Sequence, residues 1–224
     1  MGDVTPPARR RDGVLVVVGM TREAGIVGAR TRVAIGRKGL ARALAERPAA
    51  ILSFGICGAL DPSLKVGDLV IGSAVNGVLA DPEWAAQLAA ALPAARIGSF
   101  AAGDAMVADA SAKAALRERS GAMAVDMESH AVAQTGIHFA ILRAVSDIAD
   151  RSLPPAARVG LKANGRPDVA AVLKSLVADP SQLPALMRTA RDAERAYRAL
   201  GNALDLLGPG IGRPNLGEHL VDVA

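Results

Sequence analysis

Residues 49–75 read AAILSFGICGALDPSLKVGDLVIGSAV, and this stretch decides the fold class. Its first part, residues 49–60, is an almost continuous apolar run that ends in a glycine-rich turn, a pattern typical of a strand buried on both faces. Residues 61–75 begin with proline, glycine and aspartate and continue with a β-branched run, which predicts a turn followed by a second strand.

Strands and helices alternate along the rest of the chain. Further strands are predicted at 13–20 and 138–147 and a short extended segment at 124–127, and helices at 38–47, 82–92, 110–121, 128–136, 167–177 and 181–207. This alternation predicts an α/β fold, a three-layer sandwich around a central mixed, largely parallel twisted sheet. We expect a flexible N-terminus at 1–12, one domain over 13–207 and an irregular tail at 208–224.

The composition argues against a nucleic-acid or membrane-spanning protein. Apolar residues make up 51% of the 224 residues but aromatic residues only 2%, too few to build stacking surfaces for bases. The net charge is +4, and the basic run at 8–12 predicts a solvated chain end. No apolar run reaches the roughly 18 residues that a membrane span needs.

Cys57 is the only cysteine, so no internal disulfide can form, which fits a reducing compartment. The N-terminus lacks a signal-peptide pattern. We therefore expect a cytoplasmic protein in which Cys57 is a small buried residue rather than a nucleophile.

Residues 122–133, AMAVDMESHAVA, place two carboxylates in an apolar run. A carboxylate removed from water costs several kcal/mol, roughly, unless it is paired, protonated or bound to a ligand. Glu128 and Asp126 are therefore expected to have partners, although the sequence assigns no role to Asp126.

More acidic residues follow the predicted strands, where functional residues of α/β sheets tend to lie. Glu23 follows the first strand and Asp147 ends the strand at 138–147. The chain lacks the histidine or paired-cysteine spacing of a metal site, and no metal ligands are expected. It also lacks the glycine spacing of a dinucleotide fold and the lysine of a P-loop.

Four blocks then carry a family resemblance: SFGICGALDPSLKVGDLV (53–70), AAGDAMV (101–107), AVDMESHAVA (124–133) and LRAVSDIAD (142–150). In this order they resemble the nucleoside phosphorylase and nucleosidase superfamily, particularly the methylthioadenosine/S-adenosylhomocysteine nucleosidases. Residues 151–200 resemble one branch, the hopanoid-associated phosphorylases, which are implied to remove adenine from adenosylhopane. The resemblance implies a homodimer that needs no cofactor.

The resemblance also implies site residues. Asp147 matches the general acid that protonates the departing purine, Glu128 the ribose-binding glutamate, and Glu23 the acid that positions the attacking water. The substrate-binding residues implied beside them are Met127, Ser146, Gly58, Cys57, Met106 and Val107. Methionine and valine replace an aromatic residue at the base-stacking positions 106 and 107.

Hydrolysis is expected rather than phosphorolysis. The phosphate-binding arginine of phosphorylases falls on Glu23, and their Arg-x-Gly-Ser element falls on 53–56. A carboxylate there would repel phosphate. Phosphate as a co-substrate stays open as an alternative, because Arg22 or Arg37 could supply a charge by another geometry. A non-catalytic nucleoside-binding protein is a third interpretation.

The segment at 153–161 is apolar and rich in proline, which fits a pocket for an apolar 5′ substituent; an ordinary surface connection is the alternative. The helix at 181–207 is basic and amphipathic. Peripheral contact with a membrane is one interpretation of this helix, and packing against the core is the other.

Overall fold

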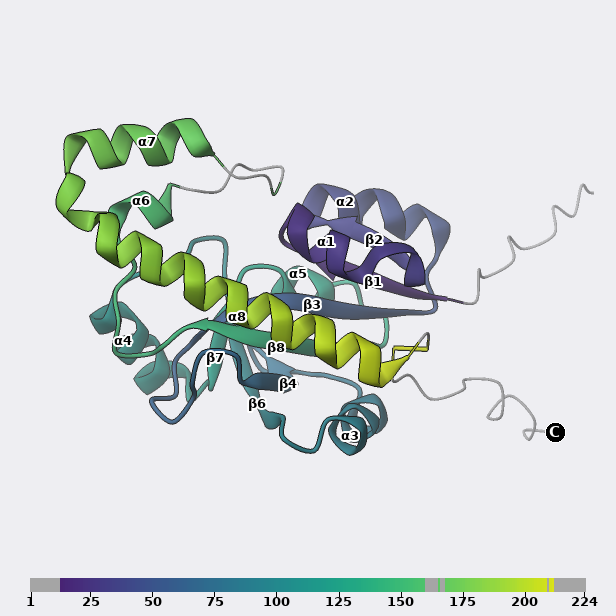
Figure 1. The fold of residues 1–224 in the computed structure, drawn as a ribbon. Helices are drawn as coiled ribbons and strands as arrows, with labels where there is room; N and C mark the ends of the chain where they lie inside the picture. The colour runs from purple at the N-terminus through teal and green to yellow at the C-terminus, as the bar shows by residue number, and fades with distance from the viewer. Residues whose placement is uncertain (1–12, 160–164, 166–167, 209, 212–224) are drawn as a thin grey trace, which may run out of the picture.

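The computed structural model describes residues 13–159, 165, 168–208 and 210–211, and the expected N-terminal segment 1–12 lies outside these residues. Eight strands form one sheet: β1 Val14–Val18, β2 Arg32–Ile35, β3 Ala50–Ala59, β4 Leu69–Val75, β5 Val78–Leu79, β6 Arg96–Ala102, β7 Ala124–Asp126 and β8 Phe139–Asp147. The helices are α1 Thr21–Val27, α2 Gly36–Ala43, α3 Pro82–Ala91, α4 Ala110–Ser120, α5 Ser129–Ala133, α6 Pro155–Arg158, α7 Val169–Ala178 and α8 Leu183–Leu207 (Figure 1).

The sheet is mixed and largely parallel, as the sequence predicts. Pairs β1–β2, β1–β3, β3–β8, β4–β6 and β6–β7 are parallel, and β3–β7, β4–β5 and β4–β8 are antiparallel. Strand β3 pairs with both β7 and β8, and β4 pairs with both β6 and β8. Five strands therefore form a closed ring of pairings, in the order β3, β8, β4, β6, β7 and back to β3. The sequence did not predict this closure.

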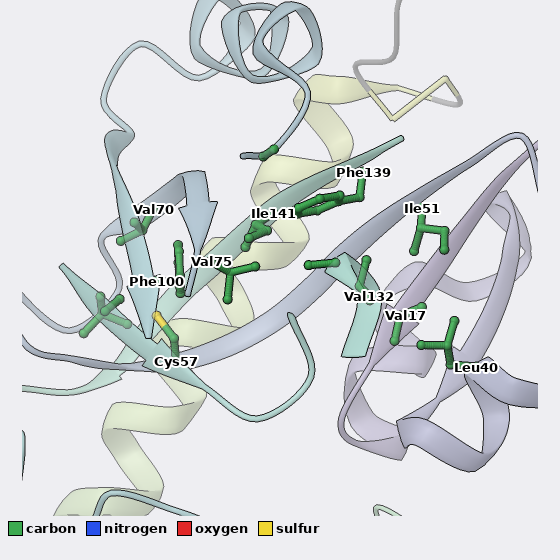
Figure 2. Close-up of a cluster of buried hydrophobic side chains, with 14 of the residues drawn as sticks. Val17, Leu40, Ile51, Cys57, Val70, Val75, Phe100, Val132, Phe139 and Ile141 are labelled. Carbon is green, nitrogen blue, oxygen red and sulfur yellow. The ribbon is translucent and has the colours of Figure 1, made fainter. Parts of the chain in front are cut away.

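Two apolar layers cover the two faces of the sheet. Successive residues of β1 alternate between them, with Val16 and Val18 in one layer and Leu15 and Val17 in the other. The first layer is covered by α8 and α3, and Figure 1 shows α8 crossing the sheet over β8. Figure 2 shows the second layer, in which Leu40 of α2 and Val132 of α5 join strand residues. Burial on both faces explains why the strands are almost continuously apolar.

Local signals explain several helix ends. Asp81 precedes α3, and its carboxylate accepts hydrogen bonds from Glu83 N and Trp84 N, both at 3.0 Å. Gly121 follows α4 with φ of 65°, the left-handed conformation expected of a C-terminal glycine. The predicted helices at 82–92, 110–121, 167–177 and 181–207 are confirmed to within about two residues.

Other elements differ from the prediction. Helix α2 begins at Gly36, and residues 44–46 form a 3-10 turn rather than more α-helix. The sequence did not predict β2, β6 or α1, because arginines and glycines interrupt their apolar patterns. The segment at 153–161, for which the sequence left a pocket wall and a surface connection as alternatives, contains the one-turn helix α6. Of the tail, Ile211 is buried and its carbonyl accepts a 3.2 Å hydrogen bond from Trp84 Nε1. Within the described residues, no helix is long and apolar enough to cross a membrane.

Candidate active site

A cavity of about 380 Å³ lies where β1, β3, β7 and β8 end, with α8 along one side. Nine residues singled out from the sequence line this cavity: Glu23, Cys57, Gly58, Met106, Val107, Met127, Glu128, Ser146 and Asp147. They come from five segments of the chain, which only the folded sheet and its connections bring together.

Glu23 projects from the first turn of α1 and is buried. Its Oε2 accepts hydrogen bonds from Gly19 N (2.9 Å) and Met20 N (2.8 Å), and its Oε1 accepts one from Ile56 N (2.8 Å). Burial raises the pKa of Glu23 from 4.5 to about 7, against the opposing effect of the Arg143 guanidinium. This carboxyl can therefore exchange a proton near neutral pH.

Arg143 lies in the middle of β8, wholly buried beneath the cavity. Its Nε lies 2.8 Å from Asp126 Oδ2, and its Nη1 lies 3.3 Å from Glu128 Oε2. Its Nη2 donates to Ser53 Oγ at 2.8 Å. This residue is not among those predicted from the sequence, although an arginine inside a buried strand is itself a signal of a buried charge network.

Arg143 also explains why the carboxylate of Asp126 lies in an apolar run. The Asp126 carboxylate pairs with Arg143 and accepts hydrogen bonds from the backbone N and the hydroxyl of Ser129. It is therefore a partner of the guanidinium beneath the cavity, a role that the sequence had left open.

Glu128 follows β7 and presents its carboxylate to the cavity, with its side chain 20% exposed. Burial raises its pKa, and the Arg143 guanidinium opposes that rise. A Cβ added at Gly19 would overlap Glu128 Oε1, so any larger residue at position 19 would displace the carboxylate from its present position.

Asp147 is the last residue of β8, and its side chain is 14% exposed. Its Oδ1 accepts a 2.9 Å hydrogen bond from Ser146 Oγ, and its Oδ2 pairs with Lys113 Nζ of α4. Lys113 was not singled out in the sequence, because one lysine in a charged surface helix carries no signal.

The two remaining walls are mostly apolar. Met106 and Val107 line one part of the wall, and Met106 is exposed. Leu153 and Ala157 also line the cavity, and Leu153 N donates a 2.8 Å hydrogen bond to Ala108 O, next to Val107. Burial raises the pKa of the Cys57 thiol well above its usual range, which leaves it an unreactive lining residue.

The two arginines considered as phosphate ligands both have carboxylate partners. Arg22 pairs with Glu194 and stacks over the Tyr197 ring at 4.5 Å, and Arg37 pairs with Asp104. Beneath the cavity, the buried Arg143 guanidinium interacts with the acidic side chains of Asp126, Glu128 and Glu23.

A family model described as the phosphorylase superfamily matches residues 13–178, most of the chain. The chain belongs to the phosphorylase superfamily. The 5′-methylthioadenosine/S-adenosylhomocysteine nucleosidase of Staphylococcus aureus (strain JH9) is 29% identical to this superfamily member over 134 residues. That match covers 46% of this chain and 59% of the relative, so the chain spans about three fifths of the relative's length.

Solved structures share the fold. The nucleosidase of the same name from Neisseria meningitidis, solved with methylthio-immucillin-A, has a TM-score of 0.63 at 18% identity, covering 87% of this chain and 97% of that one. The futalosine hydrolase of Helicobacter pylori has a TM-score of 0.60 at 15% identity, covering 88% and 97%. At these identities the likeness establishes the α/β fold of the superfamily.

Proposed function

We propose that this protein hydrolyses the N-glycosidic bond of a 5′-modified adenosine and releases adenine. The observation that carries the proposal is the meeting of Glu23, Glu128 and Asp147 in one cavity. The structure of the Colwellia psychrerythraea nucleosidase, with a TM-score of 0.53, contains adenine, which fits a purine ligand for this fold.

The three acids suit the three needs of this reaction. The base leaves as a poor anion and needs a proton, which Asp147 would donate. The ribose becomes cationic, and the Glu128 carboxylate would bind its hydroxyls and stabilise the positive charge. Water must lose a proton as it attacks, and Glu23 would accept that proton because its pKa lies near 7.

Charge favours water over phosphate as the nucleophile. Arg143 is already bound by Asp126 and lies against Glu128, so it does not offer a free cation to a phosphate. Glu23 would repel an anion from the position that it faces. We propose that the reaction needs neither phosphate nor a metal or organic cofactor.

We propose adenosylhopane, a lipid of hopanoid biosynthesis, as the substrate, because residues 151–200 resemble the hopanoid-associated branch. The small side chains of Ala157 and Ala193 leave room beside Leu153 for an apolar 5′ group. We also propose a cytoplasmic homodimer. The resemblance implies the dimer, whose molar mass light scattering would measure, and the single cysteine and the lack of a signal-peptide pattern favour the cytoplasm.

A membrane-dissolved substrate would require contact with a lipid surface. The inner face of α8 packs on the sheet through Ala196, Leu200 and Leu204, so the core-packing interpretation holds for that half of the helix. The first turns of α8 expose Leu183 and Met187, next to exposed Arg188 and Arg191, and this end fits an anionic membrane. Absence of binding to both anionic and neutral liposomes would exclude this contact.

The deciding experiment is adenine release, measured by chromatography, from methylthioadenosine, S-adenosylhomocysteine and adenosylhopane, each with and without phosphate. We expect release that does not depend on phosphate, a 5-substituted ribose with a free hydroxyl at C1 as the second product, and the highest kcat/KM on adenosylhopane. Release only with phosphate, giving a ribose 1-phosphate, would establish the phosphorylase instead. Tight binding without release would establish a nucleoside-binding protein.

A further inference from the structure

Lys113 is the buried residue of helix α4, and nothing in the packing of that helix requires a charge there. Its neighbours Ala112 and Ala114 are exposed, while the Lys113 side chain is wholly inaccessible to solvent. An ammonium group removed from water costs several kcal/mol, roughly, unless its hydrogen bonds and its charge are compensated. An apolar side chain would fill the same position without that cost.

All three ammonium donors of Lys113 have partners at the end of β8 or on the segment that follows it. The ammonium pairs with Asp147 Oδ2 and donates to Ile148 O at 2.8 Å and Arg151 O at 3.2 Å. Asp147 lines the cavity and Lys113 does not. Lys113 can therefore reach a substrate only through the carboxylate of Asp147.

The positive charge of Lys113 favours the ionised form of Asp147. The Lys113 ammonium donates to one carboxyl oxygen, while the single hydroxyl proton of Ser146 can go either to the other oxygen, at 2.9 Å, or to Cys57 O, at 3.1 Å. A carboxylate has no proton to give, yet the proposed reaction needs a proton donor at this position. The proton must come from the partner on the far side of Asp147.

We propose, building on the proposed function, that Lys113 is a positioning residue that holds Asp147 and supplies the proton that Asp147 passes to the leaving base. An N–H bond of Lys113 breaks as an O–H bond forms on Asp147. That O–H bond then breaks as an N–H bond forms on the base, which takes the electron pair of the broken glycosidic bond. Lys113 is left as a neutral amine, and the proton of the attacking water goes to Glu23. After the products leave, Glu23 gives that proton to water in the cavity, and Lys113 regains a proton from cavity water through Asp147, because Asp147 lines the cavity and Lys113 itself is inaccessible to solvent.

The test compares two leaving groups in wild type and Lys113→Met, which removes the charge and keeps an unbranched side chain. Adenine needs a proton to leave, whereas the phenolate of 4-nitrophenyl riboside leaves without one. We expect kcat for the adenosine substrate to fall about 100-fold or more, the scale of a lost proton donor, with KM changed less than about threefold. We expect kcat for 4-nitrophenyl riboside to change less than about threefold between the two proteins, because its leaving group needs no proton.

Arg117→Met is the matched control, because Arg117 lies one turn further along α4 and pairs with Asp61 outside the cavity, at 2.8 Å. It should leave both activities unchanged. Should Lys113→Met fail to fold, Lys113→Ala with added ethylamine gives the second test. Ethylamine should then restore adenine release while 4-nitrophenyl riboside cleavage stays as it was.

Equal losses on the two substrates would overturn the proton-supply role and leave Lys113 a structural residue, as would equal rescue of both by ethylamine. Unchanged adenine release in a folded Lys113→Met protein would also overturn it. Failure of the proposed function looks different, because the wild-type protein itself would then release no adenine from any of the adenosine derivatives.

Discussion

Glu23 shows how one side chain acquires a working pKa. Three backbone N–H groups and the Arg143 guanidinium stabilise its charged form, yet burial outweighs them and raises the pKa to about 7. A carboxyl with this pKa is half ionised near neutral pH, where a base that removes a proton from water is most effective. The Arg143 guanidinium is the strongest influence opposing this rise in the pKa of Glu23.

Glu23→Gln should therefore remove the proposed base, and with it the pH dependence that the Glu23 carboxyl gives to the activity. We expect kcat to fall on the order of 100-fold or more. In the wild type, kcat/KM for adenine release should rise as the pH increases through about 7, since Glu23 must lose its proton to act. Glu118→Gln, on the exposed side of α4, is the control and should match the wild type. A flat wild-type profile between acid and neutral pH would contradict the role of Glu23.

At the scale of elements, β3 supplies the close approach that the cavity needs. The strand places two glycines against two different acids: Gly55, with φ of 149°, against Glu23, and Gly58 against Asp147. A Cβ at Gly58 would lie 3.0 Å from Asp147 Oδ2 and 3.3 Å from Val125 Cγ1. A Cβ at Gly55 would overlap Glu23 Oε1, in a backbone conformation that favours glycine.

Gly58→Ala should displace Asp147 by a few tenths of an ångström, and we expect kcat for adenine release to fall about tenfold or more, because proton donors depend on position. Gly55→Ala should lower thermal stability as well, since it adds backbone strain to the overlap. Gly25→Ala in α1 is the control. No atom lies within 4 Å of its added Cβ, and alanine should stabilise this helix by about 0.5–1 kcal/mol. Full activity in Gly58→Ala would show that Asp147 tolerates displacement.

At the scale of the whole molecule, the buried acids of the cavity lower the free energy of unfolding at neutral pH. Burial raises the pKa of Glu23 and of Glu128, so the folded protein binds protons more tightly than the unfolded chain does at these positions. Stability linked to such a group is fully present below the unfolded pKa and is lost as the pH rises through the folded pKa. The folded protein should therefore lose stability between acid and neutral pH on account of these acids.

The free energy of unfolding should show this loss. For Glu23, a pKa of about 7 in the folded state against 4.5 unfolded predicts that raising the pH from about 5 to 8 costs about 2 to 3 kcal/mol. Urea unfolding of the wild type and of Glu23→Gln at both pH values measures this loss in the free energy of unfolding. Glu23→Gln should gain stability relative to the wild type as the pH rises. A difference between the two proteins that does not change with pH would contradict the raised pKa.

The sequence by itself determined the strands and helices whose patterns are regular and the individual candidates for the site. The apolar run at 49–60 is a buried strand, because burial on both faces leaves a continuous apolar pattern in the sequence. The acids at 23, 128 and 147 line one cavity, and each could be singled out because it follows a predicted strand or lies in an apolar run. Only the tertiary structure decided which charges meet. Arg143, Lys113 and Asp126 come from three different elements, and their partners depend on the closure of β3, β8, β4, β6 and β7. The pairing of buried charges is a property of distances in space, which no spacing along the chain encodes.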